Sequence, residues 1–199
     1  MIDILKFFLD ILKGFLVKKA ETVEVKYGPK FWDTIRPLFG GKMTQKQVDG
    51  VNAILKASEN LPVEFRAYLL ATTFHETAKT MEPIREYGKG RGKKYGVPGK
   101  HGQVAYGRGY VQLTWDYNYE KADRILGLGG RLIRDYDLAL DPKIAADILV
   151  KGSVEGWFTG KKLSDYLPGD YVNARRVING TDKASLIAGY AQTFERALK

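Results

Sequence analysis

Two glutamates, Glu76 and Glu86, have the surroundings that acid/base chemistry requires. Glu76 ends a run of strong helix formers, whereas Glu86 lies ten residues later in a glycine-rich stretch. Further along the chain, Thr114 offers a hydroxyl that can hold a water molecule. An acid, a base and a water-holding hydroxyl are the groups that hydrolyse a glycosidic bond, so this chemistry is our first hypothesis.

The helical spacing around Glu76 predicts that its carboxyl is partly buried. Leu69 and Thr72 project from the helix in nearly the same direction as Glu76, near the helix end. Burial and the negative end of the helix dipole both favour a protonated carboxyl, and Lys79 would oppose them if its ammonium folded back. We therefore expect Glu76 to be the proton donor.

Glu86 has the opposite surroundings. From Arg85 to Arg108, both included, there are seven Lys and Arg residues and no other acid, so positive potential should keep Glu86 ionised as a general base. A plainer alternative is that Glu76 pairs with Lys79 and that Glu86 only offsets the cations of its loop. Two acids ten residues apart are weak evidence on their own, and other motifs must support them.

Composition limits the class of protein. A chain of 199 residues that is 44% apolar can form one globular domain with a sizeable core. A net charge of +9 favours an anionic partner, such as nucleic acid, anionic lipid or an acidic cell-wall polymer. The chain has no cysteine, and its two histidines lack the HExxH spacing, so we expect chemistry without a metal or cofactor.

Residues 1–19 are strongly apolar but are too often interrupted to cross a bilayer. Four of their charged residues fall on one narrow helical face: Asp3, Lys6, Asp10 and Lys13. This amphipathic helix either packs onto the domain or lies on a membrane surface as an anchor. The start also lacks the features of a cleavable signal peptide, so we expect synthesis in the cytoplasm. We place a domain boundary between residues 1–27, the helix with its connector, and residues 28–199.

The rest of the chain predicts a mostly helical domain. Helices are expected from Thr44 to Ala57, from Pro62 to Glu76, from Tyr119 to Gly127, from Pro142 to about Gly152, over residues 171–178, and after a cap at Thr181 or Asp182. Residues 83–108 contain seven glycines and cannot form a regular helix, so short strands are expected there. The predicted class is α+β, mostly α, with a central helix followed by a glycine-rich excursion.

Four motifs occur in a distinctive order. They are residues 74–77 (FHET), 106–114 (YGRGYVQLT), 117–119 (YNY) and 177–180 (VING). Over residues 39–199 the chain resembles the family 19 chitinases and the phage endolysins related to them. The resemblance implies a lysozyme-like fold and hydrolysis with inversion at the anomeric carbon. Inversion requires the two carboxyls to lie about 6.5 to 9.5 Å apart, with a water between base and sugar.

The resemblance also implies roles for individual residues. Glu76 would be the acid, Glu86 the base, and Thr114 the group that orients water. Residues that would contact substrate or position water are Gln112, Tyr117, Asn118 and Arg176. Residues that would support the site from behind are His75, Tyr106, Arg108 and Asn179. By its helical position we expect His75 to be a packed, hydrogen-bonded histidine rather than a reacting one, and His101 should be solvated.

Differences between this sequence and the plant chitinases indicate which substrate to expect. Thr114 stands where they have serine, Tyr110 where they have proline and Arg176 where they have asparagine, and the two acids are closer in sequence. These differences and the net charge favour peptidoglycan over chitin, with Arg176 contacting a peptide carboxylate or Glu86. We expect a monomeric lysis enzyme that reaches the cell wall after release from the cytoplasm.

Two rival classes stay open. The nearest alternative is a chitinase that uses the same residues. A non-catalytic membrane-active protein is a second, and binding to nucleic acid ranks lowest because no binding motif accompanies the basic residues.

Overall fold

The structure is a computed structural model that describes residues 27–199. The amphipathic helix expected over residues 1–19, and its connector up to residue 26, lie outside the described residues. None of the helices between residues 27 and 199 combines the length and hydrophobicity that spanning a bilayer requires.

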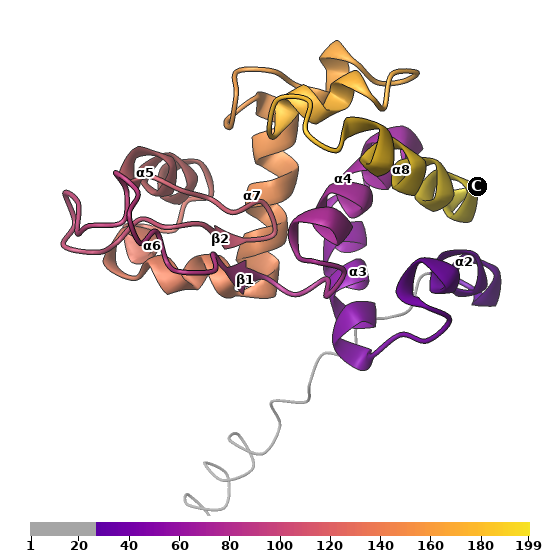
Figure 1. Cartoon of the computed structure of the whole chain (residues 1–199), viewed down its shortest axis with the longest axis horizontal. Coiled ribbons are helices and arrows are strands. Elements are labelled where there is room, and N and C mark those ends of the chain that lie inside the picture. Colours follow the sequence, from indigo (N-terminus) through magenta and orange to yellow (C-terminus); the bar gives the residue numbers. More distant parts are fainter. Residues whose placement is uncertain (1–26) are drawn as a thin grey trace, which may run out of the picture.

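The described residues form a mostly helical domain with one small sheet (Figure 1). The α-helices are α2 (Pro29–Ile35), α3 (Gln45–Ala57), α4 (Val63–Glu76), α5 (Asp116–Ile125), α6 (Arg131–Arg134), α7 (Pro142–Glu155) and α8 (Ala184–Leu198). The 3-10 helices are η1 (Arg36–Phe39), η2 (Tyr136–Leu140), η3 (Leu163–Asp165) and η4 (Asn173–Val177). The α+β class predicted from the sequence is confirmed.

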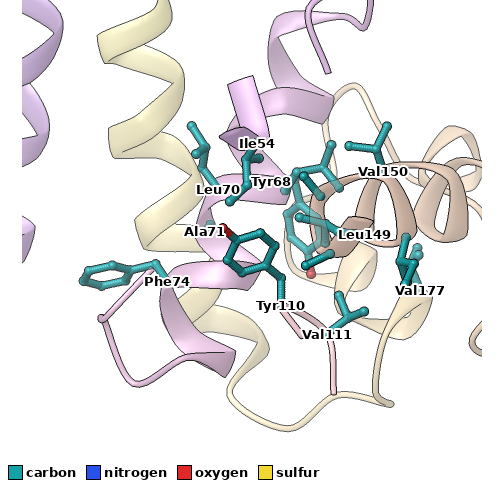
Figure 2. Packing of buried hydrophobic residues seen from close by; sticks show 14 of the residues in the cluster. Ile54, Tyr68, Leu70, Ala71, Phe74, Tyr110, Val111, Leu149, Val150 and Val177 are labelled. Carbon is teal, nitrogen blue, oxygen red and sulfur yellow. The ribbon is translucent and has the colours of Figure 1, made fainter. Parts of the chain in front are cut away.

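Helix α4 is the central element because its side chains are apolar on nearly every face. Its residues from Ala67 to Phe74 are all buried, and α8 packs along it. The ring of Phe74 meets Phe39 and Tyr190 edge-on, with centroids 4.9 and 4.8 Å apart. Figure 2 shows side chains of α3, α4 and α7 meeting those of Tyr110 and Val111, just after the small sheet. One core therefore joins the helical part to the excursion.

Two predicted helix starts are confirmed in detail. The Thr44 hydroxyl accepts a hydrogen bond from the Gln47 amide at 3.2 Å, and the Gln47 side chain accepts one from the Thr44 amide at 2.8 Å. The Asp141 carboxylate caps α7 by accepting from the amides of Lys143 and Ile144. Helix α7 continues to Glu155, past the expected end near Gly152.

The C-terminal part differs from the prediction. Residues 171–178 form only the short 3-10 helix η4, and α8 begins after Lys183, with no side-chain cap from Thr181 or Asp182. Tertiary contacts explain the difference, because the buried Arg175 of η4 takes the Asp182 carbonyl as a hydrogen-bond acceptor at 3.0 Å. Helical periodicity alone could not show that contact.

The glycine-rich excursion contains the sheet. Strands β1 (Ile84–Arg85) and β2 (Arg108–Gly109) pair antiparallel, with Ile84 opposite Gly109. The excursion lies beside α5 and α6, on the opposite side of the molecule from α2 and α8 (Figure 1). The segment between α4 and β1 therefore carries the chain from the central helix, where Glu76 lies, to the excursion, where Glu86 lies.

Candidate active site

The carboxylate of Glu76 is held by a buried arginine. Glu76 is the last residue of α4, and its Oε1 accepts a hydrogen bond from Arg175 Nη1 at 2.6 Å. The side chain of Arg175 is 2% exposed and that of Glu76 is 18% exposed. Because Arg175 Nε is also bound to the Asp182 carbonyl, the guanidinium has a fixed orientation. This arginine therefore determines where the Glu76 carboxyl lies.

The sequence argument for Glu76 included burial and the helix end but missed this cation. The guanidinium in contact with Glu76 balances the negative charge of its carboxylate. Lys79, the cation that the sequence argument did consider, instead lies with its ammonium 5.6 Å from the centre of the Phe74 ring. The partner of Glu76 is thus distant in sequence and not the neighbouring lysine.

Glu86 is held by two hydrogen-bond donors of the excursion. Tyr95 Oη donates to its Oε1 at 2.9 Å, and the Gly107 amide donates to its Oε2 at 3.0 Å. The Glu86 amide donates in turn to the Gly107 carbonyl at 2.7 Å. A Cβ at residue 107 would lie 2.9 Å from Gln112 Oε1 and 3.1 Å from Gln112 Cβ, so a glycine here leaves room for the close approach. Donors from the middle and from the end of the excursion therefore fix Glu86.

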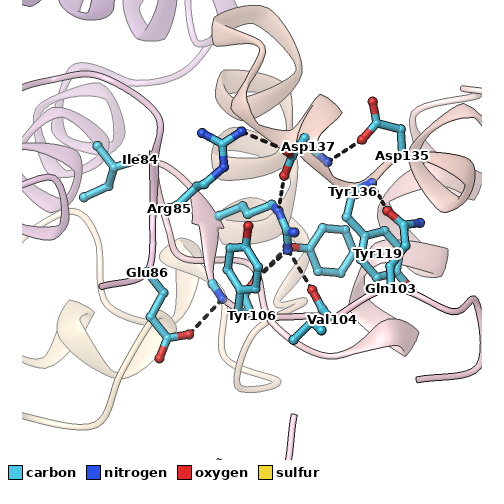
Figure 3. A network of polar contacts seen from close by, with 12 residues as sticks. Ile84, Arg85, Glu86, Gln103, Val104, Tyr106, Tyr119, Asp135, Tyr136 and Asp137 are labelled. Carbon is cyan, nitrogen blue, oxygen red and sulfur yellow. Dashed lines mark hydrogen bonds and ion pairs between the residues drawn. The ribbon is translucent and has the colours of Figure 1, made fainter. Parts of the chain in front are cut away.

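Two of the cations near Glu86 in sequence are turned away from it. Adjacent residues of a strand point to opposite faces, and Figure 3 shows Arg85 reaching Asp137 while Glu86 points away. Arg108 Nε also donates to Asp137, at 2.7 Å. Burial would raise the pKa of Asp137, but the hydrogen bonds from these two arginines outweigh it and hold the pKa below its usual range. The direct partners of Glu86 are therefore neutral donors.

His101 is a correction to the sequence analysis. We expected this side chain to be solvated, but it is half-buried and its Nε2 lies 2.7 Å from the Glu120 carboxylate. Lys100 binds the same carboxylate at 2.9 Å. The far part of the excursion is thus attached to α5 by charged groups.

Arg108 and Tyr106 form a buried layer beneath the excursion. The Arg108 guanidinium lies 3.5 Å from the centre of the Tyr106 ring, and its Nη1 donates to the carbonyls of Val104 and Tyr106 and to the Tyr119 hydroxyl. Only 5% of Arg108 is exposed. This network supports the turn that presents Gly107 to Glu86.

Thr114 lies in a turn whose backbone is strained on both sides. Gln112 and Trp115 have φ angles of 54° and 74°, which side-chain-bearing residues seldom adopt. The turn is held by hydrogen bonds from the Thr114 hydroxyl to the Gln112 carbonyl at 2.7 Å and from Asn118 Nδ2 to the Thr114 carbonyl at 2.8 Å. Because the hydroxyl hydrogen is already donated, Thr114 Oγ1 can only accept from a water molecule.

Gln112 connects this turn to the sheet. Its Nε2 donates to the carbonyls of Ile84 and Gly109, each at 3.2 Å, and its Oε1 borders Gly107. Gln112 therefore links the Thr114 turn to the residues beside Glu86.

Exposed aromatic rings continue from this turn. Tyr117 is 62% exposed and stacks on Trp115, with ring centroids 6.4 Å apart. The ring of Trp115 meets the ring of Tyr95 edge-on at 5.2 Å. Trp115 and Tyr95 were not among the residues that the sequence analysis selected. Trp115 directly follows the motif of residues 106–114, so the sequence could have indicated it. No motif lies next to Tyr95.

Three predicted residues make no hydrogen bond to Glu76 or Glu86. Arg176 is exposed and its Nε donates to Asn173 Oδ1 at 3.2 Å, while Asn179 donates its backbone amide to the Arg175 carbonyl. His75 is half-buried, and its ring has no hydrogen-bond partner between residues 27 and 199. The proposed roles of Arg176, Asn179 and His75 stay predictions. Arg175 and Arg176 are neighbours in the 3-10 helix η4, so their side chains point in different directions. The sequence analysis selected Arg176 and missed Arg175, the arginine that binds Glu76.

Curated proteins that resemble this chain match it over only part of their own length. No protein-family model matches the chain. An endochitinase of Arabidopsis thaliana is 36% identical over 84 residues, which are 42% of this chain and 27% of that protein. Endochitinase A of Zea mays is 33% identical over 79 residues, or 40% and 26% of the two chains. A second A. thaliana endochitinase is 29% identical over 181 residues, or 84% and 59%. The chain thus spans less than two thirds of each relative.

Comparison with solved structures identifies the fold. Chitinase C from Streptomyces griseus HUT6037 matches with a TM-score of 0.61 and 21% identity, over 86% of this chain and 78% of that chain. Likeness at this level of identity shows a shared fold. The lysozyme-like, chitinase-type fold that the motifs predicted is therefore confirmed.

Proposed function

We propose that this protein is a glycoside hydrolase that cleaves β-1,4 bonds between N-acetylhexosamines with inversion. Glu76 is the general acid, Glu86 the general base, and Thr114 orients the attacking water. The observation that carries the proposal is that two carboxylates, in a chitinase-type fold, are each held by separate donors. No hydrogen bond within residues 27–199 joins one to the other. An inverting mechanism needs two carboxyls that act separately, one as general acid and one as general base.

The base side suits activation of water. A carboxylate has about four acceptor positions, so Glu86 retains capacity after accepting from Tyr95 and Gly107. The attacking water would donate one hydrogen to Glu86 and the other to Thr114 Oγ1, which leaves an oxygen lone pair directed at the anomeric carbon. As the oxygen–carbon bond forms, Glu86 takes the water proton.

The acid side suits departure of the leaving sugar. Protonated Glu76 gives its proton to the glycosidic oxygen as the bond to the anomeric carbon breaks. Arg175 is positively charged throughout, so it stabilises the Glu76 carboxylate that remains. Its fixed orientation means that this stabilisation needs no rearrangement during the reaction.

Peptidoglycan glycan strands are the substrate that we propose first. The net charge of +9 and the two acids' closer spacing in sequence than in the plant enzymes favour an anionic wall polymer. We further propose an endolysin role, with synthesis in the cytoplasm and action on the wall after release. Chitin is the second candidate, because the curated relatives are named endochitinases.

Digestion of purified cell walls and of colloidal chitin tests the proposal. We expect the wild type to release reducing ends without free amines, and Glu76→Gln and Glu86→Gln each to lower the rate by about 10²- to 10⁴-fold. The first-formed anomer, followed by NMR, should be inverted. Free amines would indicate an amidase or peptidase. Lysis undiminished in Glu76→Gln would support a membrane-active protein and end the enzymatic proposal.

A further inference from the structure

The loop of residues 87–96 carries a cluster of exposed cations next to the proposed base. These are Lys89, Arg91, Lys93 and Lys94, and all four are exposed. No ion pair within residues 27–199 involves any of them. By contrast, three other basic residues of the excursion have acidic partners. Arg85 and Arg108 bind Asp137, and Lys100 binds Glu120.

The loop is fixed to Glu86 at both ends. Its backbone forms consecutive turns through the amide-to-carbonyl bonds Lys89 to Glu86, Arg91 to Gly88, Lys93 to Gly90 and Gly96 to Lys93, all between 2.9 and 3.1 Å. Near its other end, the Tyr95 hydroxyl donates to the Glu86 carboxylate. The turns need glycine because Gly88, Gly90 and Gly92 have φ angles of 83°, 76° and 75°. The cations are therefore held close to the base.

The surroundings of the loop are suited to a charged carbohydrate. Tyr87 is fully exposed beside Glu86, and the rings of Trp115 and Tyr117 continue the surface from Tyr95. Exposed rings stack on sugars, while unpaired cations attract anions over a distance of about one Debye length, roughly 8 Å at physiological salt. A neutral polymer would use the rings alone.

We propose that residues 87–96 are a recognition surface for carboxylates borne by the glycan, and that this surface makes the enzyme prefer an anionic N-acetylhexosamine polymer to a neutral one. The inference rests on the proposed function and deepens it, because it assigns the substrate class to specific side chains. The four cations raise the local concentration of the anionic glycan beside Glu86. They do not take part in bond cleavage.

The test compares two variants that lose the same charge. The loop variant replaces Lys89, Arg91, Lys93 and Lys94 by glutamine. The control variant replaces Lys30, Lys42, Lys56 and Lys151, exposed lysines of the helical part, by glutamine. Each is assayed on neutral glycol chitin and on peptidoglycan sacculi that carry peptide stems but no phosphate-bearing polymers. Thermal unfolding verifies that both variants are folded.

We expect the loop variant to lose about tenfold in kcat/KM on sacculi and to retain its activity on glycol chitin. The control variant should keep the substrate preference of the wild type, and high ionic strength should remove the difference between loop variant and wild type. Equal losses on both substrates, or the same loss in the control variant, would overturn the inference while the proposed function stands.

A further assay uses walls that carry phosphate polymers. If the loop variant lost activity on these walls but not on the phosphate-free sacculi, carboxylate recognition would also be overturned. If the wild type cleaved neither substrate, the proposed function would fail and this inference with it.

Discussion

The two proposed catalytic carboxylates are positioned by different parts of the chain. Glu76 lies on the rigid central helix and is held by Arg175, which is 99 residues away in sequence and almost completely buried. Glu86 lies in the glycine-rich excursion and is held by Tyr95 and Gly107, only 9 and 21 residues away. The acid therefore depends on assembly of the whole domain, whereas the base depends on one local segment.

This difference has a consequence for stability. If one partner of a buried ion pair is removed, the charge of the other is left without compensation. The free energy of unfolding then falls by several kcal/mol. A neutral hydrogen bond at a half-exposed carboxylate contributes much less. Loss of Arg175 should therefore destabilise the protein, whereas loss of a donor to Glu86 should mainly slow catalysis.

Arg175 gives the largest expected effect. Arg175→Ala removes the partner of Glu76 and the hydrogen bond to Asp182, so we expect the free energy of unfolding to fall by about 3 kcal/mol. Its neighbour Arg176 is exposed and is the matched control, for which Arg176→Ala should change stability by less than about 0.5 kcal/mol. Urea denaturation followed by circular dichroism measures both. Similar losses of stability at the two positions would show that the buried ion pair between Arg175 and Glu76 does not stabilise the fold.

Asp137 should give an intermediate effect. Asp137→Asn leaves the buried Arg108 with a weaker partner, but the Asp137 side chain is 43% exposed and solvent screens the pair, so we expect a loss of only about 1 kcal/mol at neutral pH. The pKa of Asp137 lies below its usual range, so its contribution is complete above the pKa of the unfolded chain and disappears as pH falls through the folded pKa.

The deficit of Asp137→Asn should therefore shrink in urea titrations repeated in acid. Asp147→Asn is the control, because its partner Lys143 is a highly exposed neighbour on the same helix. A deficit that stayed constant from neutral to acid pH would contradict the assigned role of the two arginines.

Tyr95 should give the smallest effect, and mainly on catalysis. Tyr95→Phe removes one of the two donors to Glu86 but keeps the ring beside Trp115. Burial and the hydrogen bond to Glu86 raise the pKa of this phenol, so it is a protonated donor at neutral pH. We expect kcat on glycol chitin to fall roughly fivefold, with less than about 1 kcal/mol lost in stability. Tyr87→Phe, at a fully exposed ring, should leave kcat unchanged, and an equal loss there would show that Tyr95 does not position the base.

Much of the fold followed from local patterns. The capping residues Thr44 and Asp141 marked the starts of α3 and α7, and the run of helix formers after Pro62 marked α4. The prediction was wrong where tertiary contacts override periodicity, as in η4 and at the start of α8, since burial of Arg175 sets the path of that segment.

The sequence by itself determined the central helix with Glu76 at its end, and the excursion with Glu86, because helical periodicity and glycine content are local properties. Only the tertiary structure decided which groups hold these carboxylates. Arg175 rather than Lys79 contacts Glu76, and Asp137 draws Arg85 and Arg108 away from Glu86. These contacts join side chains that lie far apart along the chain, and packing of the core brings them together, which no local pattern encodes.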